Sequence, residues 1–191
     1  MPSDRLALII VVAFFAVVPL LSAQEKKPES IAAVSAKDHV LGEGEFQGVK
    51  VGTPLAALEQ KFGKKLDKAV MKTGEGDFEY YSLRNETGQE IARFFLTDDK
   101  RVRMIETTSS LWKTTKGIHA GSTLRELRAA YPDLEIHGSE IESRTSASSA
   151  ATKWSFRIDA SFGSYELSPK ELASISPETK ILATSLLGKV N

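Results

Sequence analysis

The sequence predicts an α+β fold of two tandem repeats, each a short helix followed by an antiparallel meander of strands. The first observation is internal repetition, because segment 48–62 matches segment 117–131 at a constant offset of 69 residues. The second is the apolar spacing, which changes from a helical period inside these segments to strand-like alternation after them. The third is the turn-forming chemistry of the connectors, which are rich in Asn, Asp, Gly and Thr. Together these favour helices packed on an antiparallel sheet.

The chain opens with a segment, residues 1–23, that is typical of a secretion signal. Arg5 lies in a short basic start, residues 6–21 carry no charged side chain, and the small residues Ser22 and Ala23 precede a polar stretch. The apolar run is slightly shorter than the roughly 20 residues that span a membrane. We expect cleavage after Ala23 and a mature protein that is periplasmic or secreted. An uncleaved anchor is the alternative.

Composition narrows the classes of partner. The chain carries 25 Lys and Arg against 25 Asp and Glu residues and no cysteine. A neutral chain lacks the electrostatic footprint of a protein that binds nucleic acid or an anionic membrane. The absence of cysteine excludes disulfides and zinc–thiolate sites. Gln24 stands where a bacterial lipoprotein carries its acylated Cys, so no membrane anchor is expected after cleavage, and residues 24–45 are predicted to be a flexible tether.

Residues 46–116 are predicted to form the first repeat. Thr53 is expected to cap its helix, with Pro54 at the first helical position and Gly63 at the end. The apolar stripe of this helix, at i, i+3 and i+7, consists of Leu55, Leu58 and Phe62. Strand-like runs follow at 77–84, 89–96 and 101–107. Their short polar connectors predict an antiparallel meander.

Residues 117–191 are predicted to form the second repeat. Either Ser122 or Thr123 is expected to cap the helix, and Thr123 has the spacing of a capping box with Glu126. Pro132 is expected to end the helix. The equivalent apolar stripe consists of Leu124, Leu127 and Tyr131. A Ser-, Ala- and Thr-rich stretch at 143–152 is predicted to be a mobile loop. Strand candidates lie at 134–143, 154–158, 162–167 and 179–187, and of these 154–158 alternates most cleanly.

No combination of residues predicts a catalytic, metal or cofactor site. The three histidines, His39, His119 and His137, are scattered along the chain without ligand spacing. Carboxylate pairs occur at Asp77/Glu79, Asp98/Asp99 and Glu140/Glu142. They are expected on solvated strand faces or in turns, and nothing in the sequence indicates the opposed environments that acid–base catalysis requires.

Aromatic side chains are the better candidates for binding. Tyr80 and Tyr81 are adjacent in one predicted strand, so they point to opposite faces and one of them is expected at the surface. Trp112 lies between the repeats in a segment rich in Ser and Thr, a composition typical of recognition surfaces. The hypothetical binding residues are therefore Trp112, Tyr81 and the turn residue His119. The alternative for Trp112 is that it fills the gap between the repeats.

A short consensus recurs in both repeats: a Gly and a hydroxyl residue, a short helix, and a strand with an aromatic-x-aromatic pattern. In the first repeat it consists of Gly52-Thr53, Leu58, Gly63 and Phe78-x-Tyr80. In the second it consists of Gly121-Ser122-Thr123, Leu127, Pro132 and Trp154-x-Phe156. This consensus resembles the domain of SmpA/OmlA-type outer-membrane assembly lipoproteins and β-lactamase inhibitory protein. It is also similar to periplasmic proteins of the sigma-E-regulated lipoprotein type.

The resemblance covers about residues 46–187 and implies a non-enzymatic binding protein of the cell envelope. We therefore expect an exported, non-catalytic binding protein of the bacterial envelope, with an envelope protein as its partner and no nucleic-acid ligand. The alternative is a periplasmic hydrolase that uses carboxylates or His119.

Overall fold

The computed structural model describes residues 39–73, 76–140 and 144–187. The predicted signal, 1–23, and most of the predicted tether lie outside these residues. The helical elements are α1 (Leu55–Phe62), the 3-10 turn η2 (Gly63–Lys65), α2 (Leu124–Ala130) and α3 (Pro169–Ser174). The strands are β1 (Val40–Leu41), β2 (Leu66–Thr73), β3 (Gly76–Arg84), β4 (Glu90–Leu96), β5 (Val102–Thr107), β6 (Lys113–Thr114), β7 (Glu135–His137), β8 (Thr145–Ser148), β9 (Trp154–Ile158) and β10 (Ile181–Leu187).

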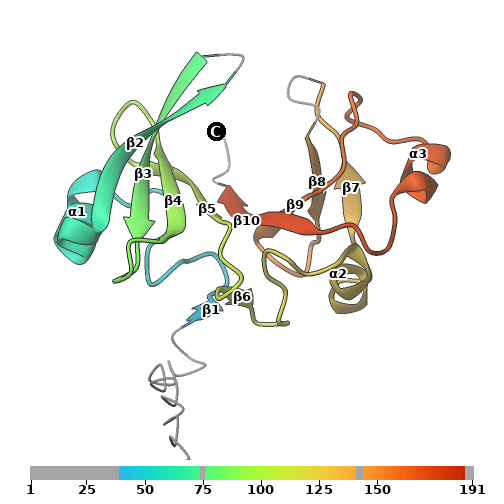
Figure 1. The fold of residues 1–191 in the computed structure, drawn as a ribbon, viewed down its shortest axis with the longest axis horizontal. Helices are drawn as coiled ribbons and strands as arrows, with labels where there is room; N and C mark the ends of the chain where they lie inside the picture. Colours follow the sequence, from blue (N-terminus) through green and yellow to red (C-terminus); the bar gives the residue numbers. More distant parts are fainter. Residues whose placement is uncertain (1–38, 74–75, 141–143, 188–191) are drawn as a thin grey trace, which may run out of the picture. The chain divides into compact units, whose positions relative to one another are not determined.

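Eight strands form one sheet in the order β2-β3-β4-β5-β10-β9-β8-β7, and every neighbouring pair in it is antiparallel. Figure 1 shows β10 in the middle of this sheet, between β5 and β9. The short strands β1 and β6 pair in parallel in a separate two-stranded sheet. Helices and a mainly antiparallel sheet confirm the predicted α+β class. Among the described residues, no helix has the length and apolar character needed to cross a membrane.

The core lies between the helices and one face of the eight-stranded sheet. Phe62 of α1 stacks on Phe94 of β4 with ring centroids 5.8 Å apart, and Tyr131, just after α2, contacts Phe156 of β9 at 5.5 Å. Other core residues from both helices are Leu58, Leu124 and Leu127, each 0% exposed. The apolar stripes predicted at i, i+3 and i+7 are therefore the surfaces with which α1 and α2 cover the sheet.

The two segments that match in sequence also make matching hydrogen bonds. The amide of Gly52 donates to the carbonyl of Val102 at 2.7 Å, and the amide of Gly121 donates to the carbonyl of Ile181 at 2.7 Å. Both glycines have a positive φ, +87° and +98°, which a residue with a Cβ rarely adopts. In each case a left-handed glycine holds the start of a helix against the first residue of a later strand, β5 or β10.

The capping prediction holds for one helix and is wrong for the other. Thr123 caps α2 with a complete capping box, in which its hydroxyl accepts from the amide of Glu126 at 3.2 Å. The N-cap of α1 is Pro54, which makes no side-chain capping bond. Thr53 instead accepts a hydrogen bond from the amide of Lys50 at 3.1 Å. Its hydroxyl therefore stabilises the turn before the helix and leaves the first turn of α1 uncapped.

The tether prediction is wrong for residues 39–45, which belong to the folded unit. Leu41 is 0% exposed and lies in β1. The indole Nε1 of Trp154 donates to the carbonyl of Gly42 at 2.8 Å. The segment lacks helical or strand periodicity because it is held by one buried leucine, by the pairing of β1 with β6 and by hydrogen bonds to residues far along the chain, which a local pattern does not reveal.

The predicted mobile loop at 143–152 contains β8. Ala147 of β8 is opposite Phe156 of β9, and both residues are 0% exposed. The small side chain of Ala147 fits beside the large ring of Phe156, which fills the core. The strand β8 is therefore buried without a run of large apolar residues of its own. The candidate strand at 162–167 forms only an isolated bridge, between Glu166 and His137. The sequence reading also omitted β2 and α3, although Ser168 caps α3 with its own capping box.

Candidate functional site

Trp112, one of the three predicted binding residues, lies in the interior. It is 4% exposed, and its ring is 4.5 Å from that of Phe46 and 5.3 Å from that of His39. The structure thus places the indole as a packing residue, as in the alternative interpretation, and leaves little of it for a partner to touch.

Tyr81 and His119, the other two, lie in different surroundings. Tyr81 of β3 is half-buried and lines a hollow of about 900 Å³. His119 is half-buried in the turn before α2, where its Nδ1 is 2.7 Å from the carbonyl oxygen of Ala120. It lines none of the three hollows described below. The structure therefore does not bring the three predicted residues together in one site.

The sheet has a second face, opposite the helices, which we call the open face. Cross-strand pairing places one polar row across it, through six neighbouring strands: Asp67, Ser82, Arg93, Glu106, Ser185 and Ser155. Residues paired in register point to the same side of a sheet, so these side chains share one surface. No residue of α1, α2 or α3 lines the hollows on or beside this face.

Arg93 is the centre of an ion network in the polar row. Its Nε donates to Glu90 at 2.6 Å, and its Nη1 donates to Glu106 at 3.3 Å. The hydroxyl of Ser82 donates to the other oxygen of Glu90 at 2.7 Å. Burial works against the charge of Arg93, but the hydrogen bond to Glu90 and the charges of both carboxylates outweigh it, so the pKa of Arg93 is raised. Glu106, only 7% exposed, is therefore compensated within the fold.

Beside the polar row lies an apolar cluster. The rings of Tyr80 and Phe95 stack with centroids 5.6 Å apart, and Arg93 lies 5.4 Å above the Tyr80 ring. Phe95 is only 4% exposed. No described helix residue lines the hollows beside it, so the cover of its ring comes from neighbouring side chains of the open face. Met104 is opposite Phe95 on β5. The open face thus combines an apolar cluster with charged groups that are already fixed in position.

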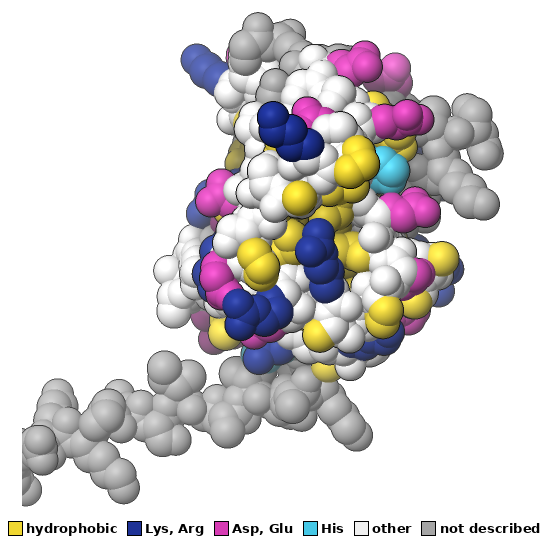
Figure 2. Space-filling model, turned by 90° about the vertical axis from the view of Figure 1, so that its right-hand side faces the viewer, with side chains coloured by type: hydrophobic (Ala, Val, Ile, Leu, Met, Phe, Trp, Pro, Cys, Tyr) yellow, Lys and Arg dark blue, Asp and Glu magenta, His cyan; other side chains and the backbone are white. Residues whose placement is uncertain are grey.

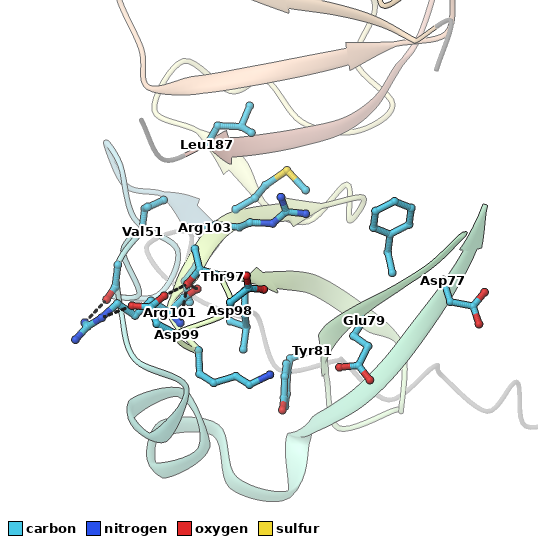
Figure 3. Close-up of a pocket in the computed structure, with 16 residues that line it drawn as sticks. Val51, Asp77, Glu79, Tyr81, Thr97, Asp98, Asp99, Arg101, Arg103 and Leu187 are labelled. Carbon is cyan, nitrogen blue, oxygen red and sulfur yellow. Dashed lines mark hydrogen bonds and ion pairs between the residues drawn. The ribbon is translucent and has the colours of Figure 1, made fainter. Parts of the chain in front are cut away.

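Three hollows lie on this face or at its edge, and the first is at the edge, because Tyr81 in its lining shares the side of the sheet on which Phe94 contacts α1. The first, the acidic hollow of about 900 Å³, is lined by β3, the β4–β5 turn and β5. Figure 3 shows Tyr81, Glu79 and Asp77 following one another along β3, with Arg103 and Leu187 across the hollow. The pKa of Glu79 is lowered by its hydrogen bond with Lys68, whose Nζ is 2.6 Å from the carboxylate.

The second hollow, the arginine cavity, has a volume of about 100 Å³. Its charged lining residues are Arg103, Glu106, Arg144 and Arg157, and its apolar lining residues are Met71, Phe78, Phe95 and Met104. The third, the serine hollow of about 780 Å³, shares four of these residues and adds the hydroxyl residues Ser139, Ser146, Ser148, Ser155 and Ser185. The small cavity therefore lies next to the larger one.

Charge of both signs is interspersed on the surface seen in Figure 2, where hydrophobic side chains lie between cationic and anionic ones. This agrees with the formal net charge of zero. Across the described parts of the chain, no group of three His, Asp or Glu residues has a geometry that could hold a metal ion.

Sequence reasoning missed the open face as a site. Its residues become neighbours only through the pairing of strands far apart in the chain, such as β5 with β10. The sequence carries only one local sign of this face, which is the alternation of polar and apolar residues along β9.

No family model matches the chain, and no curated protein matches it either. Among solved structures, the chain is similar to the crystal structure of the uncharacterized protein yfeY from Escherichia coli, with a TM-score of 0.52 and 13% sequence identity. The alignment covers 77% of this chain and 96% of that one. At this level of identity the similarity shows that the two proteins share a fold.

Proposed function

We propose that this chain is an exported, non-catalytic binding protein of the bacterial cell envelope, and that the open face of its sheet is the ligand surface. Export is supported by the n-region, h-region and small-residue order of segment 1–23. The resemblance of the repeat consensus to envelope assembly lipoproteins and β-lactamase inhibitory protein supports a binding role. The choice of surface rests on the structure.

The observation that carries this choice is the composition of the open face. It presents ordered polar groups, such as Arg93 held by Glu90 and Glu106, beside the half-buried ring of Tyr80, which stacks on the buried ring of Phe95. A concave, partly apolar surface with a few fixed polar groups is what ligand sites share. Because these groups are held by one another, little conformational freedom is lost on binding.

We further propose that the chain arose as a duplication of one helix-plus-meander unit. The hydrogen bonds of Gly52 and Gly121 support this, and so do those of the next turn: Leu55 donates to Lys100 at 2.8 Å, as Leu124 does to Thr179. The two donors of each pair, Gly52 and Gly121 and then Leu55 and Leu124, are 69 residues apart, which is the offset of the sequence repeat. Duplication would give the open face two related halves that meet at β5 and β10.

Export is tested on the native protein. We expect intact-mass measurement of the envelope fraction to find a chain that begins at Gln24. Recovery of the protein only from the cytoplasm, or with residues 1–23 attached, would contradict cleavage and export.

The ligand surface is tested with two leucines of β10 that are both exposed. Leu187, 60% exposed, lines the acidic and serine hollows, whereas Leu182, 40% exposed, lines neither. We expect Leu187→Arg to lose the proteins that co-purify with the wild type from envelope extract, and Leu182→Arg to retain them. If both variants retain the same proteins in the same amounts, the open face is not the surface.

A further inference from the structure

The most unusual polar group on the open face is the guanidinium of Arg157. Its Nε is buried and has no hydrogen-bond partner among the residues that the structure describes. A guanidinium is always charged in a protein, and a buried donor without an acceptor costs free energy. The residue lies on β9 opposite Ser146 and Ala183, neither of which carries a charge to compensate it. Such a site is complete only when an acceptor occupies the space beside the side chain.

The surroundings of Arg157 are short of negative charge. Within the described ranges, neither Arg157 nor Arg103 has a carboxylate at ion-pair distance, although both line the arginine cavity. The described carboxylate in that lining belongs to Glu106, which is bound by Arg93 at 3.3 Å. The cavity therefore attracts an anion from solution.

The size of the cavity limits what enters it. Its volume of about 100 Å³ is far below the ~300–1,000 Å³ of sites that enclose a whole small molecule. It has room for one carboxylate or phosphate group. Guanidinium groups match both in geometry, because parallel N–H donors meet two oxygens of the same anion.

The two larger hollows decide where the rest of such a ligand lies. The acidic hollow is lined by four carboxylates, Asp77, Glu79, Asp98 and Asp99, against three cationic side chains, Lys100, Arg101 and Arg103, so it offers an anion no excess of positive charge. The serine hollow shares Arg144 and Arg157 with the cavity and has the volume of a small-molecule site, about 780 Å³. Its serine hydroxyls both donate and accept hydrogen bonds, as a hydroxyl-bearing ligand requires.

We infer that the open face binds a small organic oxyanion with a hydroxyl-bearing body, of the class of sugar phosphates and sugar acids. Its anionic group lies in the arginine cavity between Arg103 and Arg157, and its body lies in the serine hollow. This inference rests on the proposed use of the open face, and it names the chemical class of ligand.

The test uses the protein with its native N-terminus and follows the side-chain Nε–H resonance of Arg157 by NMR. The probes are glucose 6-phosphate, glucuronate, inorganic phosphate and uncharged glucose. We expect at least one of the two charged sugars to shift this resonance at concentrations up to about 10 mM, a weak-binding range, and glucose to leave it unchanged. The charged sugar that shifts it distinguishes a phosphate from a carboxylate ligand.

Three variants complete the test. Arg157→Gln and Arg103→Gln are each expected to weaken binding of the active probe at least about tenfold by calorimetry, because each removes a charged donor. Arg128→Gln changes an exposed arginine of α2 that lines none of the hollows, and is expected to bind as the wild type does. If Arg157→Gln fails to fold, Arg103→Gln decides the matter, because Arg103 is exposed.

Two results would overturn the inference. The first is the absence of any shift with both charged sugars. The second is equal affinity for inorganic phosphate and glucose 6-phosphate, which would show that the serine hollow contributes nothing. If the wild type binds neither charged sugar, but co-purifies with an envelope protein that Leu187→Arg no longer binds, this ligand class is rejected and the proposed function stands.

Discussion

Trp154 and Gly42 are 112 residues apart and are joined by one hydrogen bond, from the indole Nε1 to the carbonyl oxygen, at 2.8 Å. Trp154 is 1% exposed and lies in β9, while Gly42 follows directly after β1. This bond fixes residues 39–45 to β9. Together with the burial of Leu41, it explains why these residues belong to the fold.

Replacing Trp154 by Phe is expected to loosen that segment. The aromatic ring remains, but the half-buried carbonyl of Gly42 loses the indole donor and keeps only the amide of Glu45, 3.3 Å away, at a cost of roughly 0.5–1.5 kcal/mol in the free energy of unfolding. Hydrogen exchange should show lower protection at the amides of residues 45–49, and urea denaturation should give the energy. Exchange at these amides that matches the wild type would contradict the role of the bond.

Leu58→Ala and Leu127→Ala are each expected to lower the free energy of unfolding by roughly 2–5 kcal/mol. Both side chains are 0% exposed, one in each of the two helices that cover the sheet. Urea denaturation measures the loss. A loss below about 1 kcal/mol for either leucine would show that its helix is not part of the core.

Thr123 and Thr53 occupy similar places in the sequence and should differ on mutation. Thr123→Ala removes the capping box of α2 and is expected to cost about 1 kcal/mol of stability. Thr53→Ala removes only the turn bond from Lys50 and leaves the first turn of α1 as it was. Helix-specific hydrogen exchange at the first turns of α1 and α2 distinguishes the two. Loss of protection in α1 on Thr53→Ala would contradict the structure.

The capping box also makes stability depend on pH. Hydrogen bonds from the amide and the hydroxyl of Thr123 lower the pKa of Glu126 below its ordinary value of 4.5. A carboxylate with a lowered pKa in the folded state stabilises the fold above its ordinary pKa, and that contribution disappears as pH falls through the folded-state pKa. We expect Glu126→Gln to show a smaller decrease in stability below pH 4.5 than the wild type, measured by urea denaturation across pH. An unchanged pH profile would contradict this.

Gly138 should not tolerate a side chain. A Cβ at this position would lie 2.2 Å from the carbonyl oxygen of Ser164 and 2.9 Å from that of Phe162, and both are backbone atoms with little room to move. Gly138→Ala is therefore expected to detach the 162–166 segment from β7 and to lower the melting temperature. Gly163→Ala, where the added Cβ meets nothing within 4 Å, is the control and should melt as the wild type does. Equal melting temperatures would show that this packing is absent in solution.

The sequence predicts the elements whose side-chain pattern is local. Leu55, Leu58 and Phe62 have helical spacing, and Leu58 and Phe62 pack in the core on the sheet side of α1. The meander after α1 follows from alternation and turn residues. The strand β8 could not be found in this way, because Thr-Ser-Ala-Ser contains no large apolar residue and becomes a strand by pairing with β9. Helix α3 does have a local signal, because Ser168 and Glu171 have the spacing of a capping box.

The candidate site depends on register between distant strands. Glu106 and Ser185 are neighbours because β5 pairs with β10, and Arg157 reaches the arginine cavity because β9 lies beside β10. None of these relations has a local signature. Trp112, the strongest aromatic candidate by composition, is buried because Phe46 and His39 surround it, and neither contact could be inferred from spacing along the chain.

The place of β10 in the middle of the sheet has a consequence for biogenesis. Until residues 181–187 have emerged from the ribosome, β5 and β9 each present an unpaired edge of backbone donors and acceptors. Such edges are templates for pairing with other chains. The nascent chain is therefore vulnerable to aggregation for as long as β10 is missing, and the eight-stranded sheet is completed only after β10 has been synthesised.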